Sequence, residues 1–480
     1  MSQVVSRSNS EFLYQQVMQL IRDLTIQGSL QPGEKLPSLR KMANKLAVSI
    51  PTIKQAYQTL EGQGLIEARE KSGYFLKSTQ LKQSRPKRVR LSREPVLVNK
   101  QALIEQVYGA IHQANVVPFG IANPVAAAPT DKALARTMRR VMTLAGASAI
   151  NYGPMDGFAP LKKQLIHRYL DFGIGVDNDE LVITNGAQEA LAIALKCATK
   201  PGDIIAIESP CYFGIIELIE SLGLKALEIP LCPEQGIWLE DLQHALDQHA
   251  IKACVFSTSL NNPVGSFMPD NKRQQLVALL ESRQVVLIED DVYGDLHYSA
   301  KRATPAQAYS TKGLVISCAS FSKTAAPSYR VGWIIAGKFA EQARRYKRAL
   351  SCAAPLINQW TLYEFIASGE YDRNIRLLRQ RLSSNKERMI WCLQQYMPSC
   401  ARISDPQGGC VVWVDLGSQY DTVKLFHLAL EAGISITPGL LFSAANKYRS
   451  CFRLSYGLPW SEQLERAIKT LAELVVLAKK

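Results

Sequence analysis

The chain has 480 residues, of which 47% are hydrophobic and 20% are charged. This length predicts two to four domains with a large buried core, which excludes disordered, collagen-like and small disulfide-stapled proteins. No apolar run is long enough to span a membrane, and the first residues lack the apolar segment of a signal peptide. The ten cysteines form no CxxC pair and the six histidines form no HExxH motif. We therefore expect a cytoplasmic protein with reduced thiols and no metal site.

The net charge of +14 is unevenly distributed along the chain. Residues 1–95 contain 16 Lys and Arg against 7 Asp and Glu, whereas the rest of the chain contains 40 against 35. This asymmetry predicts a basic module attached to a nearly neutral one.

The pattern of the first 78 residues predicts three short helices followed by a hairpin. Apolar residues at helical spacing indicate a first helix that stops before Gly28, and Ser38 and Ser49 are placed to cap a second and a third helix. Short apolar runs on either side of residues 71–73 predict two paired strands. The polar outer face of the third helix fits the major groove of DNA, although the same elements also fit a protein-interaction module.

The run PGEKLPSLR from Pro32, together with SGYF from Ser72, resembles the GntR-type winged helix-turn-helix. The resemblance covers about residues 11–78 and implies a DNA-binding domain over residues 1–78. It implies DNA contacts by Arg40, Ser49, Thr52, Lys54 and Gly73. The chain departs from the family pattern at Ile50-Pro51, where many relatives carry Arg and Asn, so the operator sequence is not implied.

A basic stretch follows this module. Seven basic residues and no acidic residue lie between Lys77 and Arg93, and the apolar periodicity is lost. We interpret residues 79–112 as a basic linker. It is either a solvated spacer or an arm that contacts DNA phosphates and releases their counterions.

The remaining chain alternates predicted strands and helices, which indicates an α/β fold with a mostly parallel sheet. Ligands of such sheets bind beyond the carboxyl ends of the strands. The predicted strand ends carry TNGAQ from Thr184, SPCY from Ser209, NNPVG from Asn261, EDDVY from Glu289 and SFSK from Ser320. Each motif alone is weak evidence. Together they supply a phosphate-binding turn, an aromatic ring, an amide, a carboxylate with a phenol, and an amine.

These groups are the ones that pyridoxal 5'-phosphate (PLP) requires. Lys323 supplies the amine for a Schiff base, and Asp290 keeps the pyridine nitrogen protonated. Asn262 and Tyr293 are expected to hydrogen-bond the phenolate oxygen, and Tyr212 to stack on the ring. The phosphate is expected to be held by Gly186, Ala187, Gln188, Ser320, Ser322 and Arg330. Lys323, Asp290 and Tyr293 are the expected catalytic residues.

The order Asn-Pro-x-Gly, Asp-x-x-Tyr, Ser-x-Ser-Lys and an Arg seven residues later resembles the class I/II, fold-type I aminotransferases. The resemblance implies a PLP-binding domain over residues 113–480 with a smaller C-terminal α/β subdomain. It also implies that Arg453 binds the substrate carboxylate and that Tyr152 reaches the partner's cofactor across a dimer interface. The alternative is a degenerate domain that binds no cofactor.

A GntR-type module followed by an aminotransferase-like domain resembles the MocR subfamily of transcriptional regulators. The resemblance implies a head-to-tail homodimer, with each DNA module near the partner's large domain, that binds a double-stranded DNA operator. Its aminotransferase-like domain would sense an amine or amino acid effector through aldimine exchange at Lys323. One alternative is an active aminotransferase with an appended regulatory module, and another is a sensor of the PLP level itself. The same residues serve all of these functions, so the sequence does not separate them.

Overall fold

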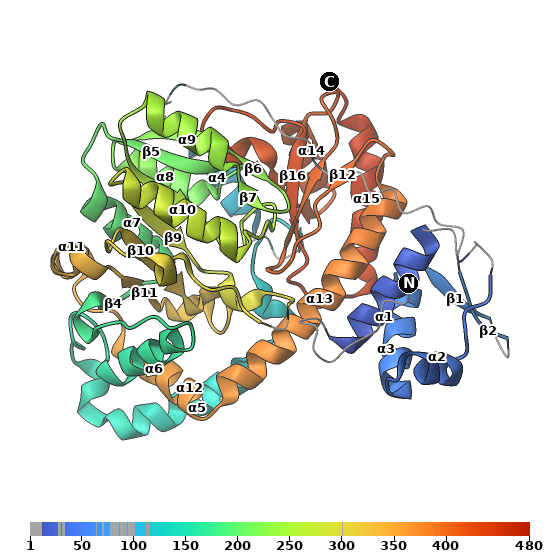
Figure 1. Ribbon diagram of the computed structural model, residues 1–480, viewed down its shortest axis with the longest axis horizontal. Helices are drawn as coiled ribbons and strands as arrows, with labels where there is room; N and C mark the ends of the chain where they lie inside the picture. Colours follow the sequence, from blue (N-terminus) through green and yellow to red (C-terminus); the bar gives the residue numbers. More distant parts are fainter. Residues whose placement is uncertain are drawn as a thin grey trace.

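The computed structural model describes residues 12–26, 30, 34–63, 65–69, 72–76, 86, 94, 101–111, 113, 115–299 and 301–480. Figure 1 shows a small N-terminal module beside a large α/β body, with one long helix, α13 (Glu370–Tyr396), running between them. Most of the expected basic linker lies outside the described residues.

The N-terminal module has the predicted winged helix-turn-helix architecture. Its elements are α1 (Leu13–Ile26), α2 (Leu39–Leu46), α3 (Ile50–Gly62), β1 (Ile66–Arg69) and β2 (Gly73–Leu76). Both predicted caps are confirmed, because the Ser38 hydroxyl accepts a hydrogen bond from the Lys41 N–H at 3.3 Å and the Ser49 hydroxyl accepts one from the Thr52 N–H at 3.3 Å. The apolar faces of the three helices close around a core of their own.

The large domain is built on an eight-stranded sheet with the order β4-β11-β10-β9-β8-β5-β6-β7. These strands are β4 (Leu181–Thr184), β5 (Ile204–Ser209), β6 (Lys225–Cys232), β7 (Gly236–Ile237), β8 (Ile251–Phe256), β9 (Val286–Asp290), β10 (Val315–Ser320) and β11 (Gly332–Ile335). Strand β11 is antiparallel to both of its neighbours and β7 is antiparallel to β6, while the other pairings are parallel. The predicted mostly parallel sheet is therefore confirmed.

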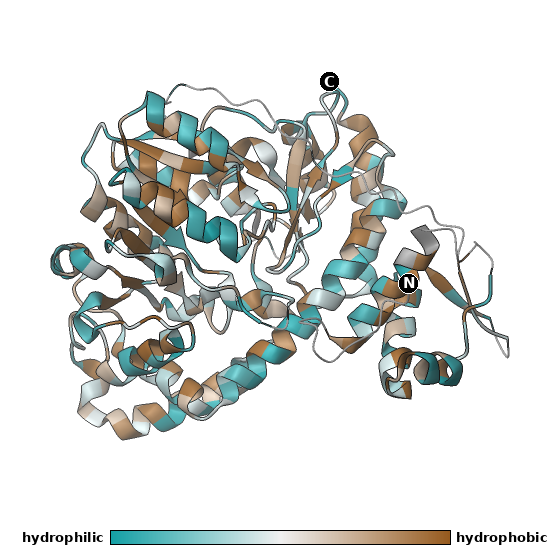
Figure 2. Ribbon diagram, in the orientation of Figure 1, coloured by the Kyte–Doolittle hydropathy of each residue, from teal (hydrophilic) through white to brown (hydrophobic). Residues whose placement is uncertain are grey.

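Both faces of this sheet are buried. Successive residues such as Ile205 and Ala206 belong to different apolar clusters, since side chains alternate between the two faces of a strand. The helices of the large domain are α5 (Asp131–Ala145), α6 (Ala159–Leu170), α7 (Ala187–Ala198), α8 (Phe213–Ser221), α9 (Leu239–Gln248), α10 (Asp270–Ser282), α11 (Ala340–Ser351) and α12 (Leu356–Ala367). Figure 2 shows the central strands as hydrophobic and the outward faces of α9 and α10 as hydrophilic.

The C-terminal subdomain packs helices α14 (Thr422–Glu431) and α15 (Glu462–Leu477) against a second sheet with the order β12-β13-β16-β15. Its strands are β12 (Arg402–Ile403), β13 (Val411–Asp415), β15 (Thr437–Pro438) and β16 (Cys451–Ser455). Strand β14 (Ile434–Ser435) pairs instead with β3 (Val117–Pro118) near the start of the body. The register sets Arg453 of β16 opposite Trp413 of β13, which fixes Arg453 on a rigid strand.

The expected linker extends too far toward the C-terminus. Residues 101–111 form helix α4 (Gln101–Ile111), and its side chains Ile104, Val107 and Ala110 are buried in the core of the body. Their spacing of three residues places them on one helical face, and burying that face holds α4 on the aminotransferase-like domain. The body therefore begins before residue 113.

All ten cysteines lie within the described residues, and none forms a disulfide. In the part of the chain that the structure describes, no helix combines the length and apolar character needed to cross a membrane.

Candidate cofactor pocket and DNA-binding module

A cavity of about 350 Å³ lies beyond the carboxyl ends of the parallel strands β5, β8, β9 and β10. This is the position expected for a ligand site in an open α/β sheet. It brings together most of the residues expected to bind the cofactor and substrate: Ala187, Gln188, Tyr212, Asn262, Asp290, Tyr293, Ser320, Ser322, Lys323, Arg330 and Arg453. The fold thus combines the strand-end motifs into one site, as the sequence predicts.

One end of the cavity is built to hold a phosphate. Helix α7 starts there, so the N–H groups of its first turn are free to bind an anion. Arg330 donates hydrogen bonds to the Asn185 carbonyl at 3.0 Å and to the Ser322 hydroxyl at 3.4 Å, which holds its charge beside this turn. The guanidinium occupies the space where Gly186 has no side chain, because a Cβ there would lie 2.4 Å from Nη2 of Arg330.

Asp290 ends strand β9 at the floor of the cavity. Burial raises the pKa of Asp290 to about 6; the Val292 N–H opposes this effect, neighbouring Asp291 adds to it, and Lys323 opposes it. A carboxylate in such a poorly solvated position gains from a cationic hydrogen-bond partner. Asp290 is thus suited to hold a proton on a pyridine nitrogen.

Lys323 follows strand β10 and donates a hydrogen bond of 2.7 Å to the Ala122 carbonyl. Burial lowers the pKa of the Lys323 amine. A lower pKa increases the neutral fraction of the amine, which is the form that attacks a carbonyl carbon. The sequence predicted Lys323 but not its partner Ala122, because no local motif marks a backbone carbonyl 201 residues away.

Two further groups converge beside Lys323. The buried Tyr293 hydroxyl has no nitrogen or oxygen partner among the described residues, and the Cys410 thiol lies beside it. The Asn262 side-chain oxygen accepts a hydrogen bond of 3.1 Å from Arg453, and an amide that accepts through oxygen still donates through nitrogen. Tyr293 and Asn262 therefore offer two donors to a single acceptor in the cavity.

Arg453 is buried and is held by neutral groups. It donates to the Thr437 hydroxyl at 2.9 Å and to the Gly120 carbonyl. Burial lowers its pKa, and no carboxylate forms an ion pair with it among the described residues. A buried guanidinium whose charge is not neutralised is a strong binding site for a carboxylate.

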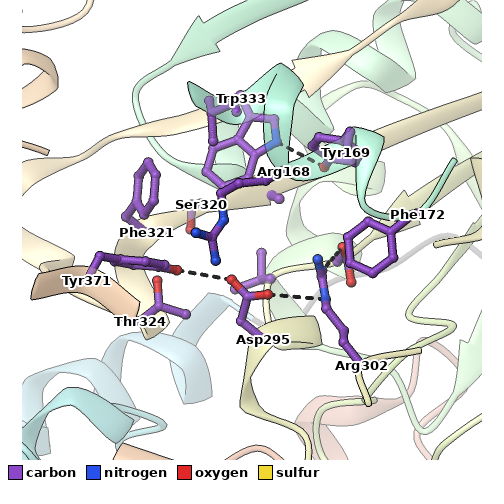
Figure 3. A pocket seen from close by; sticks show the side chains of 14 residues that line it. Arg168, Tyr169, Phe172, Asp295, Arg302, Ser320, Phe321, Thr324, Trp333 and Tyr371 are labelled. Carbon is purple, nitrogen blue, oxygen red and sulfur yellow. Dashed lines mark hydrogen bonds and ion pairs between the residues drawn. The ribbon is translucent and has the colours of Figure 1, made fainter. Parts of the chain in front are cut away.

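A second group of charged residues lies behind the cavity and fixes the segment that carries Asp290 and Tyr293. Arg302 pairs with Asp291 and, at 3.2 Å, with Asp295, and the Tyr371 hydroxyl donates to Asp295 at 3.0 Å (Figure 3). Burial opposes ionisation of Asp295, but Arg302 and the neighbouring arginines outweigh it and lower its pKa to about 2. The sequence analysis did not identify these supporting residues.

The DNA module exposes most of the residues expected to contact DNA. Arg40, Ser49, Lys54 and Gly73 are exposed, and Thr52 is half-buried beside the Ser49 cap. Gly73 adopts a φ of +103° at the start of β2, a conformation that favours glycine. The exposed positions lie on α2, on α3 and at the hairpin, as in a winged helix-turn-helix.

The opposite side of the module packs on α13. The Tyr14 hydroxyl lies close to Ser383 and Glu387, and Arg22 lies close enough to Glu387 to stabilise its negative charge. Arg22 is itself held by a hydrogen bond of 2.7 Å to Gln63 at the end of α3. Figure 1 shows this arrangement, with α1 and α3 next to α13.

Tyr152, the second residue expected to bind the substrate, lies away from the cavity of its own chain. Its side chain is 87% exposed, among other exposed apolar residues such as Ile150 and Met142. The structure describes a single chain, so the expected role of Tyr152 in a partner subunit stays a prediction.

Comparison with known proteins agrees with this geometry. Residues 114–471 match the family described as aminotransferase class I and II, and residues 13–76 match the bacterial regulatory proteins of the gntR family. The uncharacterized HTH-type transcriptional regulators YjiR and YdcR of Escherichia coli are 34% and 35% identical, covering 97% and 96% of this chain and 99% and 98% of the relatives. The chain belongs to the MocR subfamily of GntR-type regulators.

The body of this MocR-type protein also resembles solved aminotransferases. The structure of LysN, an α-aminoadipate aminotransferase from Thermus thermophilus, superposes with a TM-score of 0.71 at 25% identity, covering 78% of this chain and 97% of LysN. The family is PLP-dependent, and the residues present fit that cofactor. The turn at the start of α7 fits the phosphate of PLP, and the poorly solvated Asp290 fits its pyridine nitrogen. The unpaired Tyr293 hydroxyl fits the phenolate oxygen. When bound, PLP supplies an aldehyde that condenses with amines and a ring that withdraws electrons.

Proposed function

We propose that this MocR-type chain is a DNA-binding regulator whose aminotransferase-like domain senses an amine or amino acid. The amine of the effector would displace the Lys323 amine from the cofactor, and Arg453 would hold its carboxylate. The proposal also includes a cytoplasmic head-to-tail homodimer in which Tyr152 reaches the partner's cavity. In the described chain the DNA module rests on α13 of its own body, so the module's expected position near the partner's large domain is not part of this proposal. Arg40, Ser49, Thr52, Lys54 and Gly73 would contact the operator.

Helix α13 is the observation that carries this proposal. At 27 residues it is about 40 Å long, and it touches both functional parts of the chain. Asn374 donates a hydrogen bond of 3.2 Å to the carbonyl of Thr324, the residue after Lys323. Asn385 donates one of 3.0 Å to the carbonyl of Tyr456, three residues after Arg453.

The same helix holds the DNA module through Ser383 and Glu387, which flank Asn385. The segments that carry Lys323 and Arg453 therefore both contact the helix on which the module rests. A movement of either segment can be transmitted to that helix. An effector that binds two arrangements of these segments with different affinity would shift the position of the module. A transaminase with an unrelated DNA module would not need this connection.

The test uses the PLP-loaded protein and double-stranded DNA from upstream of its own gene. The protein is titrated with amines while the absorbance of the bound cofactor and the affinity for DNA are measured together. The proposal predicts that an amine that changes the absorbance also changes the affinity for DNA. An amine that changes the absorbance fully without any effect on DNA affinity would contradict it.

Lys323→Ala is the matched variant. It removes the amine that links to the cofactor aldehyde, and the one hydrogen bond that the Lys323 amine makes in the described structure is to Ala122. We expect a folded protein that binds DNA, lacks the visible band of the linked cofactor and no longer responds to amines. A persisting band would show that another amine forms the link.

An active aminotransferase is the second candidate, because the three expected catalytic residues, Lys323, Asp290 and Tyr293, all line the cavity. Sustained conversion of an amino acid and an oxo acid, at effector concentrations that leave DNA affinity unchanged, would favour the enzyme over the sensor.

A further inference from the structure

The structure also indicates which kind of effector the cavity accepts, an inference that rests on the proposed sensing function. The cofactor and the effector's carboxylate account for every described charged group that lines the cavity. These charged groups are Asp290, Lys323, Arg330 and Arg453. A second acidic or basic group on the effector therefore meets no described side chain of opposite charge there.

The wall that leads away from Arg453 is aromatic. The Arg453 guanidinium lies 5.3 Å from the ring centre of Phe442, and Phe442 contacts Phe213 edge-on at 5.7 Å. Phe213 in turn contacts Tyr108 of α4 edge-on at 5.7 Å, and both Phe213 and Tyr108 line the cavity. A chain of aromatic edges thus runs from the carboxylate-binding site to Tyr108.

Tyr108 stands at the end of this wall where the cavity opens. Tyr108 is 42% exposed, and its hydroxyl lies close to Tyr212 and within electrostatic range of Arg453. Ile121 adds a further apolar surface to the lining of the cavity. The side chain of an α-amino acid held between Lys323 and Arg453 would therefore meet rings and alkyl groups.

An acidic residue lies near the outer end of this wall. Glu217 on α8 acts on both the Tyr108 and Tyr212 hydroxyls. Burial, together with Glu220, raises the pKa of Glu217. No lining residue among those described is placed to offset a distal carboxylate.

We propose that the effector is an α-amino acid with a large apolar, aromatic side chain, and that Tyr108 of α4 is the residue that recognises this side chain. Burial of an apolar ring against Tyr108 and Phe213 would favour such a ligand. A dicarboxylic amino acid would bind more weakly, because no described cation is left to pair with its second carboxylate.

The test titrates the PLP-loaded protein with L-phenylalanine, L-leucine, L-glutamate and phenethylamine, which lacks the carboxylate. Absorbance of the bound cofactor and affinity for DNA are both measured. We expect L-phenylalanine to act at concentrations at least about tenfold lower than L-glutamate and phenethylamine, with L-leucine between them. If none of the four changes the absorbance, the sensing function itself fails. If L-glutamate acts at the same or lower concentration than L-phenylalanine, this inference alone is wrong.

Variants of Tyr108 test its role. Tyr108→Ala is expected to reduce the preference for L-phenylalanine over L-glutamate about tenfold, whereas Tyr108→Phe keeps the ring and restores the preference. Tyr346→Ala is the control, because this half-buried tyrosine lies on α11 outside the cavity. A preference that is unchanged in Tyr108→Ala, or reduced equally in Tyr346→Ala, would overturn the assignment of Tyr108.

Discussion

The guanidinium of Arg330 fills the space above Gly186, and a Cβ on Gly186 would lie 2.4 Å from its Nη2 atom. The two residues are far apart in the sequence, yet the conformation of each depends on the other. Gly186 adopts a φ of +83° that starts α7, and Arg330 fixes that turn through the neighbouring Asn185 carbonyl. The charged and the N–H components of the phosphate site are therefore assembled together.

Gly186→Ala should weaken PLP binding because the new methyl group displaces Arg330. Loss of a charge-assisted hydrogen bond of about 1.5–3 kcal/mol predicts a fall in affinity of about tenfold to a hundredfold. Fluorescence or absorbance titration of the cofactor-free protein with PLP measures it. Gly202→Ala is the control, since Gly202 has a similar φ of +90° with nothing within 4 Å. Equal losses of affinity in both variants would point to general backbone strain instead.

Asp290→Asn should stabilise the cofactor-free protein above pH 6 and weaken its cofactor binding. The pKa of Asp290 is raised from 3.8 to about 6 by burial, so folding favours its protonated form. In the wild type, the contribution of Asp290 to the free energy of unfolding is fully present below about pH 4 and is lost as the pH rises through about 6. Asparagine does not titrate, so the variant does not lose stability in this way. The shift of about 2 pKa units corresponds to up to about 3 kcal/mol.

Urea unfolding of both proteins at acidic, intermediate and alkaline pH measures this difference. The free energies of unfolding of the two proteins should be similar at the lowest pH and should differ most at the highest pH. A difference in the free energy of unfolding that does not vary with pH would mean that Asp290 is ionised normally in the folded protein.

Arg40→Ala should weaken DNA binding and make it less sensitive to salt. Arg40 is exposed at the start of α2, where a phosphate contact would release about one counterion. The measurement is the slope of log affinity against log salt concentration. Arg139→Ala, an exposed arginine on α5 of the aminotransferase-like body, should leave the slope unchanged. If the slope of Arg40→Ala equals that of the wild type, Arg40 does not contact a DNA phosphate.

Tyr14→Phe and Ser383→Ala should uncouple the two parts of the chain. Each removes a hydroxyl from the contact between α1 and α13, and neither residue lines the cavity. We expect the effector to change the cofactor absorbance as in wild type but to change the affinity for DNA less. Lys386→Ala is the neighbouring control on α13, because Lys386 pairs with Asp405 of the C-terminal subdomain at 3.1 Å. A full response in both Tyr14→Phe and Ser383→Ala would show that the signal travels by another route.

Much of the fold was predictable because its signals are local. The caps at Ser38 and Ser49 depend on hydrogen bonds to residues three positions away. The error at α4 has the opposite cause. Its apolar residues Ile104, Val107 and Ala110 follow a long basic and polar stretch, and only their burial in the distant body identifies the helix as part of it.

The sequence by itself determined which chemical groups this protein carries and that they stand at the ends of strands. Short motifs encode those positions directly, since the direction of the chain in a parallel sheet brings all such ends to one edge. The tertiary structure decided the rest: Arg453 meets Asn262 across 191 residues, Tyr108 closes an aromatic wall, and α13 joins the cavity to the DNA module. These contacts depend on which helices and sheets pack against one another, and the choice of packing partner leaves no periodic or motif signal in the chain.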